Sequence, residues 1–382
     1  MTNPIISTNI RNMIPRYILH KVVKTLDESN KIVIVLGPRQ AGKTTLITQI
    51  QAEIKSDSFL KLNCDIEEQL NVINTTSIEN LKNLFSQKKY LFVDEVQRLD
   101  NAGLTLKIIH DSFPDLKVLV TGSSSFEIKN TLSDALTGRY FDFILFPLSF
   151  DESQGNLASF LTYGGYPDVF LQPDTEIKKA LLSKITESYL FRDVLSFSKI
   201  RNSQALVNLA RALAFQIGSE VNENELSKRI KIDRKTLLNY LEILEKSFVI
   251  IRLHPYSQNP RREIGRRYKV YFLDLGIRNQ LIGQFNPLDL RSDYGKIWEN
   301  FLIIERRKLH SVSLTPPPCF FWRNLNGSEV DYLELVDGKL SAYEFKLSQS
   351  QKIRIPSSFV SEYKVKPILI TPDNFQNFIT NI

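Results

Sequence analysis

Cysteine is nearly absent from this chain of 382 residues, which contains only Cys64 and Cys319. The two cysteines lie far apart and form neither a C-x-x-C pair nor a cysteine–histidine spacing, which disfavours a disulfide framework and a zinc site. No apolar run approaches the ~18 residues that a membrane span requires. The first residues, Met1–Pro4, lack the basic and then apolar order of a signal peptide. We therefore expect a cytoplasmic protein that is not inserted in a membrane.

Acidic residues are scarce in one part of the chain. The net charge is +7, and the segment from Lys199 to Lys269 holds 15 basic residues against 7 acidic ones, which accounts for the whole surplus. A local basic excess indicates a polyanionic partner, although a solvated basic face would have the same composition. The hydrophobic fraction of 42% is that of an ordinary globular protein. Since one core rarely exceeds ~250–300 residues, we expect several domains.

Short β-branched runs alternate with helical patterns from Lys31 to about Phe150. Strands separated by helices predict an α/β fold with a parallel sheet and helices on both faces. The predicted strands are Ile32–Leu36, Phe59–Asn63, Tyr90–Val93, Lys117–Thr121 and Phe141–Phe146. From Asp151 to about Ile200 the pattern becomes helical, with apolar residues at Leu181, Ile185, Tyr189 and Val194.

A phosphate-binding loop follows the first predicted strand. Residues 37–44 read G-x-x-x-x-G-K-T, between a strand and the start of a helix, which is the context that this motif requires. The glycines let backbone N–H groups surround phosphate oxygens, and the helix N-terminus adds its positive dipole end. We expect Lys43 to reach the β- and γ-phosphates and Thr44 to hold Mg²⁺. The predicted nucleotide-binding residues are Gly37, Pro38, Arg39, Gln40, Ala41, Gly42, Lys43, Thr44 and Thr45.

Two carboxylates follow the predicted strand Tyr90–Val93. Asp94 and Glu95 would lie at the carboxyl edge of the sheet, where such sheets bind ligands, and buried carboxylates are costly unless they hold a cation or water. We expect Asp94 to complete the Mg²⁺ shell and Glu95 to orient or deprotonate the attacking water. The alternative is a glycine-rich loop with an unrelated acidic turn, but both motifs have the correct context. ATP or ADP is therefore the predicted ligand.

Two further residues are candidates for the ATPase reaction. Ser123 follows the strand Lys117–Thr121 and is placed to hydrogen-bond the γ-phosphate or the water, although Gly-Ser runs are also ordinary loop chemistry. Arg139 is a candidate arginine finger, with a surface arginine as the alternative.

These motifs together resemble those of prokaryotic AAA-plus ATPases. The resemblance is carried by the phosphate loop and by Val93–Glu95, Thr121–Ser124 and Leu136–Arg139, and it covers nearly the whole chain. Gly164–Pro167 and Arg192–Val194 look like signatures of a subgroup with a C-terminal domain of unknown function related to restriction-endonuclease folds. The resemblance implies an ATPase core over residues 1–150 and a helical lid over 151–200. It also implies ring-shaped homo-oligomers, in which Arg139 would serve a neighbouring subunit. For Arg192 it implies a sensing role, with a structural Arg–Asp pair as the alternative.

A winged helix is predicted over residues 201–285. Asn224–Arg229 reads as a short helix, and Asp233 caps a second helix, Arg234–Lys246, whose buried stripe is Leu237, Leu241 and Leu244. The strands Phe248–Leu253 and Tyr268–Phe272 with the basic loop between them would form the wing. Such modules place a helix in the major groove and arginines on phosphates, but they also bind proteins. The predicted DNA contacts are Arg234, Lys235, Asn239, Arg261, Arg262, Arg266 and Arg267.

The last predicted domain, residues 286–382, contains a hairpin with a carboxylate pair. Asp337-Gly338 predicts a two-residue turn, so that Val336 faces Lys339 and Asp331 faces Glu344. Directly opposed like charges destabilise a sheet, and a bound divalent cation would reverse that penalty. Asp331, Glu344 and Lys346 have the layout of PD-(D/E)XK nucleases, and Glu299 in the helical run Trp298–Lys308 resembles their upstream acidic residue. In such enzymes the metal activates water and the lysine stabilises developing charge.

Two simpler interpretations of this hairpin remain. Glu329 and Lys346 would face each other and form an ion pair, or a nuclease fold could serve only as a binding platform. The sequence therefore predicts a Mg²⁺-dependent ATPase that couples nucleotide state to DNA binding and to a nuclease-like domain. The alternative is an ATP-driven switch that recruits a protein and cuts nothing.

Overall fold

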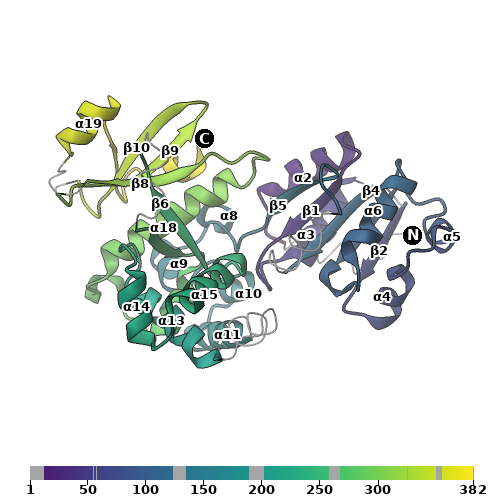
Figure 1. Ribbon diagram of the computed structural model, residues 1–382, viewed down its shortest axis with the longest axis horizontal. Helices are drawn as coiled ribbons and strands as arrows, with labels where there is room; N and C mark the ends of the chain where they lie inside the picture. Colours follow the sequence, from purple (N-terminus) through teal and green to yellow (C-terminus); the bar gives the residue numbers. More distant parts are fainter. Residues whose placement is uncertain are drawn as a thin grey trace. The chain divides into compact units, whose positions relative to one another are not determined.

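The computed structural model describes residues 13–54, 56, 58–123, 135–188, 202–257, 267–324, 326–349 and 355–381. The chain forms two compact units, Met1–Leu148 with Ser311–Leu314, and Ser149–His310 with Thr315–Ile382 (Figure 1). No helix in these ranges is long and apolar enough to cross a membrane.

The first unit is built on a parallel sheet of five strands in the order β2-β3-β4-β1-β5. This result confirms the predicted α/β core, because all five strands occur where the sequence pattern predicts them. The strands are β1 (Ile32–Leu36), β2 (Phe59–Asn63), β3 (Tyr90–Asp94), β4 (Lys117–Gly122) and β5 (Tyr140–Ile144). The described helices of the unit are α2 (Ile18–Glu28), α3 (Lys43–Ile54), α4 (Glu67–Ile73), α5 (Ile78–Leu84) and α6 (Ala102–Ser112), with the 3₁₀ turn η1 (Val96–Arg98).

The central strands of this sheet are apolar and buried along their whole length. Every residue of β1 and β3 is buried, which is typical of strands covered by helices on both faces. Val33 and Val35 belong to a core cluster with α2 and α3, and Val312 and Leu314 of the returning segment pack against the same cluster. Because the strands are parallel, the residues that follow β1, β3 and β4 meet at one edge of the sheet.

The second unit begins with four helices, two of which, α9 and α11, pack on α17 (Leu275–Ile282). They are α8 (Phe150–Ser153), α9 (Leu157–Tyr163), α10 (Pro167–Leu171) and α11 (Thr175–Glu187). The motif Gly164–Pro167 has a packing role here, because the Gly165 N–H donates to Asp274 Oδ2 at 2.7 Å. A Cβ on Gly164 would lie 2.2 Å from Asp274 Oδ1, so no larger residue fits. Arg192 lies outside the described residues.

Three helices and a hairpin, followed by α17, occupy the region where a winged helix is predicted. They are α13 (Ser203–Phe215), α14 (Glu223–Ile230), α15 (Arg234–Lys246), β6 (Ile250–Pro255) and β7 (Lys269–Phe272). Asp233 caps α15 through the Thr236 N–H, and Leu237, Leu241 and Leu244 are buried, as the sequence pattern predicts.

The hairpin β6–β7 does not stand alone, because it belongs to a mixed sheet of six strands in the order β11-β10-β9-β8-β6-β7 (Figure 1). Parallel pairing of His254 and Pro255 with Phe320 and Phe321 joins it to the C-terminal strands. The sheet therefore runs across the boundary predicted at residue 285. The remaining elements are η3 (Leu288–Leu290), α18 (Tyr294–His310), β8 (Cys319–Arg323), β9 (Glu329–Val336), β10 (Lys339–Phe345), α19 (Ser357–Tyr363), β11 (Ile368–Ile370) and α20 (Phe375–Thr380).

The β9–β10 hairpin has the predicted register. Val336 pairs with Lys339 and Tyr332 pairs with Tyr343, and positive φ angles at Asp337 and Gly338 form the turn. The pairing places Asp331 beside the start of the Glu344–Phe345 segment, where Asp331 Oδ2 accepts from the Phe345 N–H at 2.8 Å.

A buried ion-pair network joins this hairpin to α18. Glu334 accepts from Arg306 Nη2 at 2.6 Å and lies 2.7 Å from His310 Nε2. Burial opposes ionisation of Glu334, but the hydrogen bonds from His310 and Arg306 lower its pKa to about 2. Arg306 also donates to the Phe378 carbonyl of α20 at 2.7 Å. The network therefore connects three elements of the second unit.

We expect Glu334→Gln to destabilise the second unit by about 3 kcal/mol, because it leaves the Arg306 guanidinium buried without its anion. The folded-state pKa of Glu334 lies below its unfolded value of ~4.3. Its stabilisation is therefore fully present above pH ~4.3 and is lost as the pH falls toward 2. Denaturant unfolding between pH 7 and pH 3 should show a weaker pH dependence for this variant than for the wild type. The exposed-site control Glu79→Gln should match the wild type, and equal pH dependence in all three proteins would contradict the assignment.

Candidate functional site

The phosphate loop, residues 37–42, connects β1 to α3 at the carboxyl edge of the first sheet. The Gly37 N–H donates to the Gly122 carbonyl of the neighbouring strand end at 3.3 Å. A Cβ on Gly37 would lie 2.2 Å from the Leu145 carbonyl oxygen, so the close approach of two strand ends requires glycine. Pro38 and Ala41 are buried, while Gln40, Thr44 and Thr45 are exposed and Arg39 is partly exposed.

Lys43, the first residue of α3, points back into the loop. Its Nζ donates to the Gly37 and Pro38 carbonyls at 3.0 Å each, and it lies 3.9 Å from Glu95 Oε1. The side chain is buried. Carbonyl groups of the loop therefore hold the Lys43 ammonium group, where the sequence predicts that phosphates bind.

Arg16, which the sequence analysis missed, anchors the same loop. Its buried guanidinium donates to the Ala41 carbonyl at 2.8 Å and to the Phe146 carbonyl at 2.6 Å. The contact holds the loop against the end of β5. An isolated arginine upstream of the motif carries no sequence signal of such a role.

Asp94, the last residue of β3, accepts hydrogen bonds from two hydroxyl groups. Thr44 Oγ1 donates to Asp94 Oδ2 at 2.7 Å, and Thr121 Oγ1 of β4 donates to Asp94 Oδ1. Asp94 and Thr121 are buried. Hydroxyl and carboxylate oxygens are the ligands that Mg²⁺ prefers, and hydroxyl donors can release a carboxylate to a cation. The donor set therefore fits a magnesium ion, with Thr121 as a supporting residue that the sequence did not identify.

Glu95 and Ser123 lie beside this pair and are joined by Gln97. Glu95 adopts a left-handed conformation, with φ of 55°, which turns the chain sharply after β3. The Gln97 amide donates to Glu95 Oε2 and, at 3.0 Å, to Ser123 Oγ. Strand ends that are neighbours in the sheet thus bring together a carboxylate, an amide and a hydroxyl near Lys43.

Arg139 lies at the other edge of this sheet. Its carbonyl accepts from the Ile32 N–H at the start of β1, while the phosphate loop follows the end of that strand. The guanidinium donates to Asp111 Oδ1 at 2.9 Å, and with the His110 contact this lowers the pKa of Asp111 to about 2. A strand of five residues, ~17 Å long, separates Arg139 from the loop of its own chain.

The predicted DNA contacts have different surroundings. Arg234 pairs with Glu223 at 2.7 Å, whereas Lys235 and Asn239 are exposed on α15. Arg267 is exposed just before β7. The other three predicted contacts lie outside the described residues, namely Arg261, Arg262 and Arg266.

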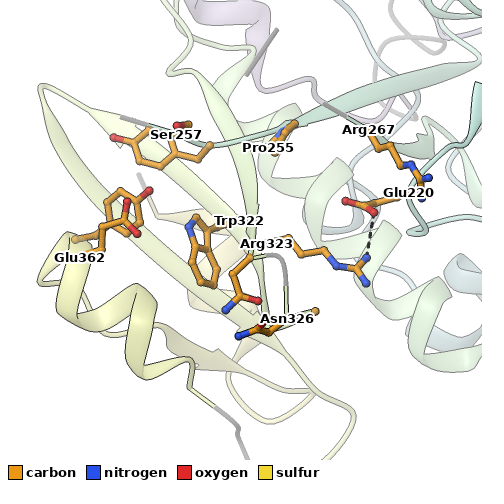
Figure 2. Close-up of a pocket in the computed structure, with 12 residues that line it drawn as sticks. Glu220, Pro255, Ser257, Arg267, Trp322, Arg323, Asn326 and Glu362 are labelled. Atoms are coloured by element: carbon orange, nitrogen blue, oxygen red, sulfur yellow. Dashed lines mark ion pairs between the residues drawn. The ribbon is translucent and has the colours of Figure 1, made fainter. Parts of the chain in front are cut away.

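A cleft of about 660 Å³ lies at the carboxyl ends of β6 and β8. Figure 2 shows Trp322 and Arg323 at its floor, with Arg323 directed toward Glu220 at 3.3 Å. Both flanks of the basic stretch, Ser257 and Arg267, line the cleft. The full lining is Glu220, Pro255, Tyr256, Ser257, Arg267, Trp322, Arg323, Asn324, Asn326, Gly327, Glu362 and Tyr363.

An acidic cluster occupies the open end of the β9–β10 hairpin. Among the described residues, carboxylate oxygens of Glu299, Glu329 and Asp331 lie within 4.8 Å of one another. Burial, together with Glu299 and Glu344, raises the pKa of Asp331 to about 7. Lys346 pairs with Glu344 at 2.6 Å and lies 3.9 Å from Asp331. The structure thus brings the four predicted nuclease residues to one place and adds Glu329.

Glu329 does not form the ion pair with Lys346 that its register suggested. It contacts Lys269 of β7 instead, and Lys269 Nζ also lies 2.9 Å from Glu299 Oε1. The Tyr271 hydroxyl donates to the same Glu299 oxygen at 2.6 Å. Lys269 and Tyr271 come from β7, so their place beside the cluster depends on the six-stranded sheet and has no local sequence signal.

Comparisons with known proteins identify the first unit more specifically than the second. Residues 29–154 match a family model described as an AAA domain. Residues 154–288 and 294–381 match two families described as domains of unknown function, DUF8612 and DUF4143.

Two curated relatives resemble most of the chain. An uncharacterised protein of Methanocaldococcus jannaschii is 27% identical over 354 residues, covering 85% of this chain and 77% of that protein. An uncharacterised protein of Haemophilus influenzae is 26% identical over 334 residues, covering 80% of each. Among solved structures, a Walker-type ATPase of Pyrococcus abyssi has a TM-score of 0.48 and 16% identity, over 71% of this chain and 96% of that one. With the parallel sheet and its loop, the family match supports a P-loop ATPase domain of the AAA type in the first unit.

Thr121→Val tests the support of Asp94. The change removes the hydroxyl that donates to the carboxylate and keeps the volume of a fully buried side chain. We expect Mg²⁺-dependent ATP affinity to fall about 5- to 30-fold, since a lost hydrogen bond to a charged group costs ~1–2 kcal/mol. Isothermal titration with and without Mg²⁺ measures the effect. Thr25→Val, which removes a hydroxyl bonded within α2, is the control, and an unchanged Mg²⁺ dependence in Thr121→Val would rule out the supporting role.

Proposed function

We propose that the first unit binds ATP with Mg²⁺ and hydrolyses it, and that the nucleotide state controls a nucleic-acid-binding second unit. The observation that carries the ATPase proposal is the convergence of Lys43, Thr44, Asp94 and Glu95 around one glycine-bounded loop. Lys43 and Thr44 at the start of α3 meet Asp94 and Glu95 at the end of β3. ADP would bind the same loop after hydrolysis.

The chemistry of the loop depends on exchangeable contacts. The Lys43 ammonium donates to two loop carbonyls, and phosphate oxygens are stronger acceptors for it because they carry charge. Backbone N–H groups of the loop and the N-terminus of α3 would hold the remaining phosphate charge. Thr44 and Asp94 would hold Mg²⁺, which neutralises charge on the β- and γ-phosphates when it is bound.

Glu95 is the proposed base or water-orienting group. Gln97 bridges it to Ser123, so the carboxylate and the hydroxyl are held together at the carboxyl ends of β3 and β4. Ser123 would contact the γ-phosphate or the attacking water. Arg139 lies at the edge of its own sheet that is opposite to the phosphate loop. We therefore propose that it acts on the nucleotide of a neighbouring subunit in a homo-oligomer.

Lys43→Ala and Glu95→Gln separate binding from hydrolysis. We expect Lys43→Ala to lose ATP affinity, because it removes the charge at the phosphate position. Glu95→Gln should keep ATP affinity and lower kcat by about 10²–10⁴-fold, the range for removal of a general base. A phosphate-release assay and a fluorescent-nucleotide titration measure the two effects. Glu53→Gln, near the other end of α3 and in contact with His20, is the control, and wild-type turnover in both site variants would exclude this ATPase site.

Nucleic-acid binding is proposed for the cleft at the ends of β6 and β8. The supporting observation is that Ser257 and Arg267 line it, so the arginine-containing stretch between them begins and ends at its rim. Tyr256 and Tyr363 are partly exposed aromatic residues of the lining, and nucleobases stack on such side chains without strict sequence preference. A nucleic acid would place phosphates near Arg267 and bases in the cleft.

Recruitment of a protein is the second candidate. It is favoured by the ion pairs that neutralise two basic groups of this surface, Arg234 with Glu223 and Arg323 with Glu220. A surface whose charges are already paired attracts a polyanion less strongly. Metal-dependent cleavage by the acidic cluster stays a prediction from the sequence.

Arg267→Ala and Lys235→Ala test whether the nucleic acid contacts the cleft, which Arg267 lines, or the helix α15, which carries Lys235. If the cleft binds, Arg267→Ala should weaken binding to single-stranded DNA and reduce the salt slope by about one unit, as one lost phosphate contact does. Lys235→Ala should then leave both unchanged. Fluorescence anisotropy from 50 to 300 mM salt, over which the Debye length falls from about 14 Å to about 6 Å, provides the measurement. Wild-type binding that is absent, or insensitive to both variants, would favour the protein-recruiting function.

A further inference from the structure

The acidic cluster of the second unit is already matched by positive charge. Glu299 and Glu329 contact Lys269, while Asp331 and Glu344 contact Lys346. Two further groups lie at the margin, Lys296 at 3.8 Å from Glu299, and Arg323, which contacts Glu329 at 3.6 Å and also pairs with Glu220. Four carboxylates thus have four basic partners within ion-pair distance.

Lys269 differs from the other basic partners in its burial. Its side chain is 1% exposed, against 27% for Lys346 and 46% for Lys296. Its Nζ lies 2.9 Å from Glu299 Oε1 and also contacts Glu329. The ammonium group is therefore buried between two carboxylates.

The ammonium group stands among the ligands that a metal would use. Glu299, Glu329 and Asp331 are the carboxylates whose oxygens lie within 4.8 Å of one another, and Lys269 contacts the first two directly. A divalent ion needs carboxylate oxygens at ~2.0–2.6 Å. It would have to displace the ammonium ion or share its ligands at a repulsive distance. The donor set in this arrangement does not fit a divalent metal.

We propose that Lys269 is the resident cation of this cluster and excludes divalent metal from it. The C-terminal unit is then not a Mg²⁺- or Mn²⁺-loaded nuclease in this conformation, whatever the likeness of its side chains to one. Removal of the Lys269 ammonium converts the cluster into a divalent-cation site, because it leaves Glu299, Glu329 and Asp331 without their central positive charge. Lys269 lies two residues after Arg267 of the cleft, and Arg323 of the cleft shares Glu329 with it. Lys269 and the acidic cluster therefore border the proposed nucleic-acid site.

The test is Mn²⁺ binding to the full chain, measured by electron paramagnetic resonance of the free ion in the absence of nucleotide. All proteins carry Asp94→Asn, so that the ATPase site lacks the carboxylate proposed to hold its metal. We expect Lys269→Met to bind one Mn²⁺ per chain at least about tenfold more tightly than the Asp94→Asn parent, which corresponds to ~1.4 kcal/mol. Lys346→Met is the matched control, since it removes an ammonium from the same cluster and leaves Lys269 in place. It should bind Mn²⁺ like the parent.

Three results would overturn the proposal. The first is that the parent protein binds Mn²⁺ and loses this binding with Glu329→Gln. The second is that Lys269→Met folds but binds no more Mn²⁺ than the parent. The third is that Lys346→Met gains the same Mn²⁺ site. Circular dichroism establishes whether each variant is folded. If Lys269→Met does not fold, the parent and its Glu329→Gln variant decide the question, because metal exclusion predicts that neither binds Mn²⁺ in the second unit. ATP turnover of the protein with Asp94 intact is a separate readout that fails only if the ATPase proposal is wrong.

Discussion

Buried carboxylates constrain both units of this protein, because an ionised carboxylate removed from water must be matched by donors or by positive charge. Asp94 is matched by the hydroxyls of Thr44 and Thr121. Glu334 is matched by Arg306 and His310, and the acidic cluster is matched by lysines. For Asp94, Glu334 and Glu329 the partners come from a different strand or helix. The requirement therefore determines which elements must pack together.

The path of the chain gives the two units a means of communication. Unit one includes Ser311–Leu314, so the chain passes between the units after Leu148, after His310 and again after Leu314. The returning segment directly follows α18, which carries Glu299 and Arg306, and its residues Val312 and Leu314 pack on the core beneath the phosphate loop. If nucleotide state controls the second unit, as we propose, these crossings are its covalent links to the first unit, and a covalent link alone sets no direction or size for the coupling.

Local patterns in the sequence were sufficient for much of the fold and of the ATP site. The five parallel strands, the Asp233 cap and the β9–β10 register each depend on neighbouring residues, so periodicity and turn chemistry predict them. The partners that the sequence did not reveal are Arg16, Thr121 and Lys269, which act at a distance along the chain through strand order. No spacing rule predicts that β6 pairs with β8, and that pairing is what joins Lys269 of β7 to the sheet that carries Glu329. The same pairing explains why Glu329 binds Lys269 and not the Lys346 that faces it in the hairpin.

The two acidic sites differ in the kind of partner that holds their carboxylates, and this difference has a functional consequence. A hydroxyl donor is neutral, so Thr44 can turn its oxygen toward a cation and become a ligand beside Asp94 without any charge having to leave. The Lys269 ammonium is itself a cation, so a metal can enter the second site only if the Lys269 side chain or the whole of β7 moves away from the carboxylates. Such a departure exposes Glu299 and Glu329 to each other's repulsion and costs several kcal/mol unless a replacement cation arrives at the same time. On the function that we propose, the first site accepts and releases a metal with each nucleotide, whereas the second retains a charge that belongs to the chain.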